Sequence, residues 1–208
     1  MSIKKIISGT ALALTLLAIC GCASSPRVVN PDQDTGGTSG GLDSRDFQNA
    51  ASVMLQDLFR SHRLENPNGG RYVMEIGKVK NDTSLRGVSS DQIIWTIKEE
   101  LTNSGLVAIT SAISSGSAGN VNAGVYGVRE LRGDAEFNQA SVQKAGTLIA
   151  ADLSISGQIL QRDNRLGSTL RTEYYFQLKI TDLKTGLDFW QKQNVIVKEG
   201  NAREMRRR

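Results

Sequence analysis

The stretch TEYYFQLKITDLKTGLDFWQKQNVIV, residues 172–197, decides the fold of this chain of 208 residues. Its first half alternates apolar with polar side chains, namely Tyr174, Phe176, Leu178 and Ile180 against Glu173, Tyr175, Gln177 and Lys179. A period of two predicts a strand with one buried face. The turn-forming DLKTG, residues 182–186, then predicts a reversal into a second strand over residues 189–197. The stretch is therefore expected to form an antiparallel hairpin.

The same alternation extends upstream of the hairpin. Leu153, Ile155 and Ile159 alternate with polar residues, and turn residues run from Asp163-Asn164 to Gly167-Ser168. This pattern predicts a third strand, so that residues 153–197 form a three-stranded antiparallel meander. We expect the buried side or closing edge of the meander to hold Phe176, Leu178, Ile180 and Trp190. The alternative for Trp190 is an exposed aromatic that binds a partner.

The first half of the folded region has helical periodicity around one strand. Residues 44–62 predict a helix, residues 72–79 a strand and residues 106–110 another strand. Between the strands, Ser89 and Gln92 resemble a capping box that opens a helix through Asn103, and Gly105 suits its C-terminal cap. The apolar stripes of the two helices are Val53, Leu55, Leu58 and Phe59, and Ile93, Ile94, Ile97 and Leu101. The order is β-α-β.

The expected fold class is α+β, with a mixed sheet of about five strands flanked by helices. The sheet combines the β-α-β unit with the antiparallel meander. Between them, residues 111–124 are small and polar, and we expect a mobile loop. The segments VYGVRELR and AEFNQASVQKAGTLI then predict two short helices around Gly133.

The chain begins with a secretion signal. Lys4 and Lys5 precede an apolar run over residues 6–19, which is shorter than the roughly 20 residues that span a bilayer. Ile19-Cys20-Gly21-Cys22 resembles a bacterial lipobox, which implies cleavage after Gly21 and acylation of Cys22. Alternatives are a plain secretory peptide with incidental cysteines and a buried core helix. We therefore assign residues 1–21 to the signal peptide and residues 22–43 to the lipidated cysteine and a flexible linker.

The remaining residues divide into one domain, 44–199, and a basic tail, 200–208, expected to be disordered. The mature domain has no cysteine, and its only histidine is His62, at a predicted helix end. No catalytic motif and no metal-ligand spacing is present, so we expect neither an enzyme nor a cofactor or metal site. A pair of carboxylates brought together in space stays open. The basic tail lacks a nucleic-acid motif, so nucleic-acid binding is not expected.

Four segments carry a resemblance to a known family. These are YVMEIGKVKNDTS (72–84), SSDQIIWTIKEELTNSG (89–105), VRELRGDAEFNQASVQKAGTLIAADLSISGQI (128–159) and TEYYFQLKITDLKTGLDFWQKQNVIVKEG (172–200). With the lipobox, they resemble the LpoB-type penicillin-binding protein activators. The resemblance implies a TolB-amino-terminal-like domain and no enzymatic activity. It further implies a lipoprotein of the outer membrane, on its periplasmic face, that binds a class A penicillin-binding protein and stimulates peptidoglycan synthesis.

Two alternatives accompany this interpretation. Enteric members carry a long proline-rich linker, whereas residues 23–43 contain only Pro26 and Pro31, so inner-membrane anchoring remains open. A coil of this length spans about 25 Å. The chain could instead be a structural periplasmic lipoprotein of an envelope or secretion assembly. No small-molecule substrate is expected in either case.

The docking residues are predicted from the segment VYGVRELRGDAEF, residues 125–137. Interfaces concentrate binding energy in arginine and aromatic side chains. We expect Arg129 and Arg132 to contact acidic groups on the synthase, with Tyr126 packing beside them. The alternative is an ordinary solvated helix face.

The lipobox leads to a first prediction. Cys22→Ala should leave the protein unlipidated and extractable by washing, because Cys22 alone fits the acylated position, whereas Cys20→Ala should change little. Metabolic labelling with a palmitate analogue checks this. Labelling that survives Cys22→Ala would contradict the assignment.

Overall fold

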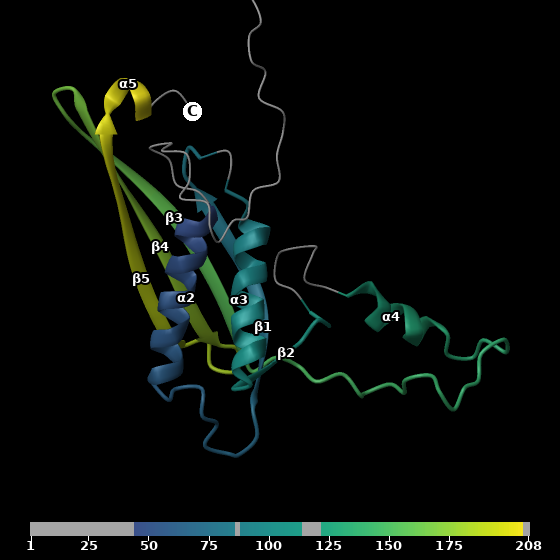
Figure 1. Cartoon of the computed structure of the whole chain (residues 1–208). Coiled ribbons are helices and arrows are strands. Elements are labelled where there is room, and N and C mark those ends of the chain that lie inside the picture. Colours follow the sequence, from purple (N-terminus) through teal and green to yellow (C-terminus); the bar gives the residue numbers. More distant parts are fainter. Residues whose placement is uncertain (1–43, 86–87, 114–121, 206–208) are drawn as a thin grey trace, which may run out of the picture. The chain divides into compact units, whose positions relative to one another are not determined.

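The computed structural model describes residues 44–85, 88–113 and 122–205, which form one mixed sheet and its helices (Figure 1). The predicted signal peptide, Cys22, the linker 22–43 and residues 114–121 and 206–208 lie outside the described residues. The helices are α2 (Ser44–Arg60), α3 (Ser90–Ser104), α4 (Ala123–Glu130) and α5 (Ala202–Met205). The strands are β1 (Tyr72–Asp82), β2 (Val107–Ile109), β3 (Leu153–Leu166), β4 (Thr169–Asp182) and β5 (Asp188–Asn201).

The sheet has the order β2-β1-β3-β4-β5. β1 pairs in parallel with β2 and with β3, whereas β3, β4 and β5 pair antiparallel. The predicted α+β class, with a β-α-β unit followed by an antiparallel meander, is confirmed. The three strands of the meander are long, and Leu166 pairs with Thr169 across a two-residue turn at Gly167-Ser168.

One face of the sheet packs against α2 and α3, and this interface is the core (Figure 1). On β4 the predicted inward residues Tyr174, Phe176, Leu178 and Ile180 are buried. Trp190 is also buried, at 8% exposure, so it is not an exposed binding aromatic. The T-shaped ring pair of Phe47 and Phe176, with centroids 6.0 Å apart, joins α2 to β4.

The α3 helix has both predicted caps. The Ser89 hydroxyl accepts a hydrogen bond from the Gln92 amide, and Gly105 ends the helix with φ 67°. All four residues of its predicted stripe are buried. A positive φ is accessible to glycine because it has no Cβ, so Gly105 lets the chain leave the helix at once toward β2.

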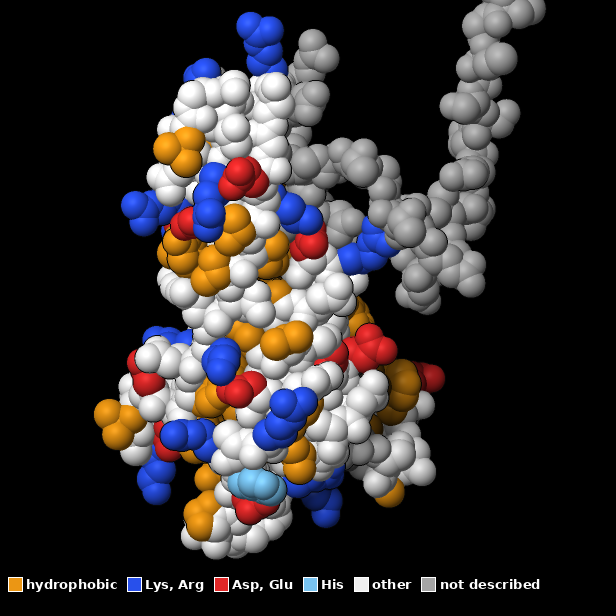
Figure 2. Space-filling view, turned by 60° about the vertical axis from the view of Figure 1, so that its left-hand side comes forward, with side chains coloured by type: hydrophobic (Ala, Val, Ile, Leu, Met, Phe, Trp, Pro, Cys, Tyr) orange, Lys and Arg blue, Asp and Glu red, His pale blue; other side chains and the backbone are white. Residues whose placement is uncertain are grey.

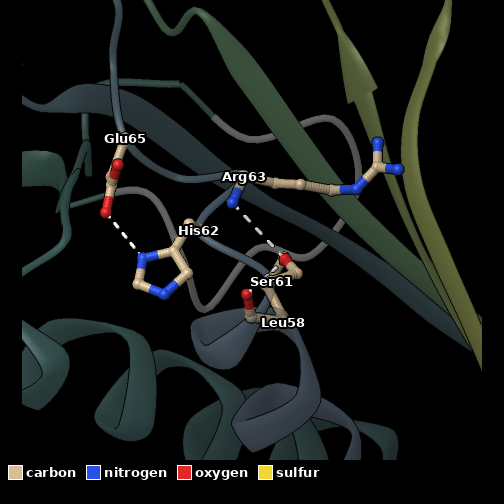
Figure 3. A network of polar contacts seen from close by, with 5 residues as sticks. All are labelled: Leu58, Ser61, His62, Arg63 and Glu65. Carbon is tan, nitrogen blue, oxygen red and sulfur yellow. Dashed lines mark hydrogen bonds and ion pairs between the residues drawn. The ribbon is translucent and has the colours of Figure 1, made fainter.

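Polar contacts around His62 end the α2 helix (Figure 3). The Ser61 hydroxyl donates to the Leu58 carbonyl at 2.6 Å, and His62 adopts φ 56°. The His62 imidazole then hydrogen-bonds the Glu65 carboxylate at 2.7 Å on an exposed surface. His62 therefore lies in the turn that follows the helix.

Several predictions about boundaries and faces are wrong. Val53 of α2 is 57% exposed, because its position lies beside rather than on the buried stripe. Asp163 and Asn164 lie within β3, paired with Thr172 and Arg171, since the turn needs only two residues. The folded region continues past residue 199, because β5 runs to Asn201 and buried Ala202 begins α5.

The segment expected to be a second helix, residues 135–149, contains turns and no helix. The first expected helix does form, as α4, but it spans Ala123–Glu130 rather than residues 125–132. Gly133 lies just before this segment and has φ 83°, and Gly146 lies within it and has φ 77°. These conformations interrupt a right-handed helix at both positions.

The Phe176–Phe47 contact leads to a stability prediction. Phe176→Ala should lower the free energy of unfolding by about 3–5 kcal/mol, because it removes a fully buried ring between the helix and the sheet. Chemical denaturation followed by circular dichroism measures this. Lys179→Ala, on the opposite face of the same strand, is the control and should change stability by at most about 1 kcal/mol. Equal effects of the two changes would contradict the assigned face.

Candidate functional site

The long connection between β2 and β3 is the candidate site, and we refer to residues 122–150 as the β2–β3 segment. Its two ends flank the start of β1. Thr110, just after β2, donates its amide to the Met74 carbonyl at 3.0 Å. Asp152, just before β3, donates to the Val73 carbonyl at 2.7 Å and accepts from the Val73 amide at 2.9 Å. The segment therefore leaves and rejoins the sheet on either side of one strand.

The β2–β3 segment has no buried residue of its own. It instead exposes five large hydrophobic side chains, Tyr126, Val128, Phe137, Leu148 and Ile149. Several exposed apolar side chains on one short segment mark an interaction site more often than a single exposed residue does. Loops held by a rigid sheet also commonly carry binding functions.

One side chain holds the turn after α4. The Gln139 amide nitrogen donates to the carbonyls of Leu131, Asp134 and Phe137, at 3.1, 2.6 and 3.2 Å. Its amide oxygen accepts from the Gly133 backbone amide at 3.0 Å. A glutamine offers both donors and an acceptor, so one side chain can replace the backbone bonds that a helix would make. Residues 131–139 are therefore ordered without regular secondary structure.

The three predicted docking residues lie together on α4 and the turn after it, and each makes an internal contact. The Tyr126 hydroxyl donates to the Ala112 carbonyl. Arg129 donates from Nη2 to the Thr147 hydroxyl at 3.1 Å, and Arg132 donates from Nε to the Gln143 carbonyl at 2.8 Å. The side chains thus tie α4 to residues 143–147, a role that the sequence analysis did not predict.

Arg129 keeps unused donors. Its Nε and Nη1 atoms are buried and have no hydrogen-bond partner among the described residues. An unpaired buried donor is costly, and guanidinium groups pair readily with carboxylates. Because both atoms are enclosed, an acidic group from outside the chain could pair with them only after the Arg129 side chain moves outward.

Phe137, Leu148 and Ile149 were not predicted as docking residues, although Phe137 ends the predicted docking segment 125–137, and all three were expected on a short helix. Trp95, which is 64% exposed on α3, was not predicted as a docking residue either. The Lys98 ammonium lies 5.3 Å from the centre of the Trp95 ring, a cation–π contact on the helix surface. Trp95 lies at a position between the buried residues of α3, so its exposure follows from the helical period.

No group of metal-ligating side chains gathers among the described residues. In the same part of the chain, no helix has the length and apolar character needed to cross a membrane.

The chain folds as an α+β domain that presents the β2–β3 segment as its candidate binding surface. Residues 46–196 match the family described as peptidoglycan-synthase activator LpoB, and the chain belongs to that family. Comparison with curated protein sequences finds no match.

Solved structures similar to the chain include two LpoB C-terminal domains and one further lipoprotein. The LpoB C-terminal domain from Salmonella enterica has a TM-score of 0.38 and 14% identity, covering 74% of this chain and 98% of that one. The LpoB C-terminal domain from Escherichia coli has a TM-score of 0.38 and 12% identity, covering 72% and 94%. Lipoprotein GNA1162 from Neisseria meningitidis has a TM-score of 0.34 and 10% identity, covering 64% and 85%.

The Gln139 contacts lead to a prediction about local order. Gln139→Ala should speed hydrogen exchange of the Gly133 amide and its neighbours, because each lost bond removes roughly 0.5–1.5 kcal/mol of local stability. The melting temperature of the sheet should not change. Gln143→Ala is the matched control, since only the backbone carbonyl of Gln143 is used. Equal exchange in both variants would show that Gln139 does not order the segment.

Proposed function

We propose that the chain is a lipoprotein, acylated at Cys22, that binds a class A penicillin-binding protein and stimulates its peptidoglycan synthesis. The family supports activation of a peptidoglycan synthase. The observation that carries the docking assignment is the set of exposed hydrophobic side chains on the ordered β2–β3 segment. We place the anchor in the outer membrane, with the domain in the periplasm.

The β2–β3 segment is preorganised for binding. Gln139 and the two arginines hold it in one conformation before any partner arrives. Ordering a flexible loop on binding would cost affinity, and prior ordering removes much of that cost. The hydrophobic side chains supply buried area in a complex, and Arg129 and Arg132 supply positive charge toward acidic groups on the synthase.

Activation follows from unequal affinity for two states of the synthase. A ligand shifts a conformational equilibrium only by the difference between its affinities for the two conformers. The domain therefore binds the active conformer of the synthase more tightly than the inactive one. It needs no chemistry of its own to raise the rate.

The docking surface leads to a prediction about stimulation. Phe137→Asp with Ile149→Asp should weaken binding to the cognate synthase by about 1 kcal/mol or more, because charge replaces two exposed hydrophobic contacts. The measurement is lipid II polymerisation by the synthase with the soluble chain from Ala23 to Arg208, together with a binding isotherm. Stimulation at a fixed, subsaturating concentration should fall accordingly.

The matched control is Leu183→Asp with Leu187→Asp, in the turn between β4 and β5. Phe137 and Ile149 are 47% and 71% exposed, and Leu183 and Leu187 are 46% and 68% exposed, so the two pairs change equal surface. Full stimulation by the Phe137→Asp, Ile149→Asp variant would contradict the docking site. If stimulation is lost only in Trp95→Ala, the docking site lies on α3 instead. No stimulation by the wild-type chain would favour the structural assembly component.

The arginines are tested in the same assay. Arg129→Glu with Arg132→Glu removes both the charges and the internal bonds, whereas Thr147→Val removes only the hydroxyl that Arg129 contacts. Full stimulation by Thr147→Val together with loss in the double variant assigns the effect to contact with acidic groups on the synthase. Equal loss in both variants assigns the arginines a structural role.

A further inference from the structure

The second surface of interest is the outer face of the sheet, opposite α2 and α3. Both helices lie on one side of the strands (Figure 1), and among the described residues no helix packs against the other side. A groove of about 680 Å³ lies across β3, β4 and β5 on this face. The volume is within the usual range for small-ligand sites.

The groove is lined by polar side chains in two cross-strand rows. One row joins Gln158, Gln177 and Gln193, and the next joins Ser156, Lys179 and Gln191. The registers of β3–β4 and β4–β5 place each row straight across the three strands. The polar lining argues against a lipid or another apolar ligand.

The glutamine row keeps hydrogen-bonding capacity toward the groove. Gln158 donates to Gln177 at 2.6 Å, and Gln177 donates to Gln193 at 2.6 Å. Each side-chain amide has two N–H donors and two lone pairs on its oxygen, so these bonds leave both kinds of group unused on the row. A ligand that offers donors and acceptors at short spacing can pair with them. Sugar hydroxyl groups and N-acetyl amides offer both donors and acceptors at such spacing.

The charges at the groove are internally paired. Lys179 pairs with Asp188 at 3.3 Å, whereas the Lys192 side chain turns to the opposite face of the sheet and pairs with Asp57 of α2 at 3.2 Å. Figure 2 shows the β5 edge of the sheet, where positive and negative side chains are interspersed rather than gathered by sign. An anionic ligand would therefore gain little from this surface, and the favoured ligand is neutral.

An apolar row borders the amides. Leu160, Tyr175 and Val195 lie opposite one another in register, one step along the strands from the glutamines. The Tyr175 hydroxyl donates to the Glu173 carboxylate at 2.6 Å, which fixes the ring and lowers the pKa of Glu173. An aromatic ring beside amides offers a flat apolar contact for the C–H face of a pyranose.

We propose that this groove binds a neutral glycan bearing N-acetyl groups. Gln158, Gln177 and Gln193 pair with its hydroxyl and amide groups, and Tyr175 packs against a sugar ring. The choice of amino-sugar chain rests on the proposed function, because the glycan made by a peptidoglycan synthase contains such sugars. The groove is separate from the β2–β3 segment, so the domain has two binding surfaces.

The test is titration of the soluble chain, Ala23 to Arg208, with a β-1,4-linked N-acetylglucosamine oligosaccharide. The readout is the NMR shift of glutamine side-chain amides. We expect millimolar or tighter binding and about tenfold weaker binding in Gln177→Leu. Gln143→Leu, an equal change at another exposed glutamine, should bind as the wild type does. A cellulose oligosaccharide, which lacks the N-acetyl groups, should bind more weakly.

Four outcomes would overturn the proposal. These are no shift with the amino-sugar chain, equal binding by Gln177→Leu, equal binding of the cellulose oligosaccharide, and preferred binding of an anionic glycan. The titration contains no synthase, so it does not depend on the outcome of the stimulation assay. If Gln177→Leu loses stimulation while the wild-type chain binds no oligosaccharide, the groove belongs to the protein partner.

Discussion

The edge-to-face contact of Phe47 with Phe176 determines how the rest of the domain assembles. Phe47 lies in the first turn of α2, and Phe176 lies in the middle of β4, so the contact joins the two ends of the folded chain. Two ion pairs extend the same interface along β5, Asp57 with Lys192 at 3.2 Å and Asp46 with Lys198 at 3.1 Å. These pairs are partly solvated and add little energy, but they align the helix with the strand.

The position of α2 also decides which surfaces remain open. Because α2 and α3 together cover one face of the sheet, every second residue of β4 from Leu170 to Ile180 is buried, and on β3 Leu153, Ile155 and Ile159 are buried. Gly157 shows how tightly the buried face is packed. A Cβ at that position would lie 2.7 Å from the Gln177 carbonyl oxygen and 2.8 Å from Leu178, so only glycine fits. The opposite face carries no such constraint and can hold polar rows.

The strands, α3 and most of α2 could be predicted from the sequence because periodic burial dominates there. Ile93, Ile94 and Ile97 are buried at the spacing of a helix, and Phe176 and Leu178 at the spacing of a strand. The pattern fails where burial is absent. Residues 135–149 were predicted to form a short helix, yet no helix forms there. The turn at 131–139 is set by hydrogen bonds of Gln139 to residues two to eight positions away.

The same reasoning explains why the candidate site was predicted only in part. Tyr126, Arg129 and Arg132 were found from residue type, and they do lie together, but their internal contacts depend on Ala112, Thr147 and Gln143. No local pattern marks those partners. The outer groove could not be predicted from the sequence for a similar reason. Gln158, Gln177 and Gln193 become neighbours only through the registers of three strands.

Separation of the two surfaces has a consequence for activation. A domain that bound only the synthase would distinguish synthase molecules only by their conformation. A domain that also holds the glycan product would be retained where new strands emerge, because tethering raises the effective concentration of each site for its ligand. Neither affinity then needs to be high. On these two proposals, weak binding at both surfaces would give selective contact with a working synthase, and an idle synthase, which offers a single surface, would be released.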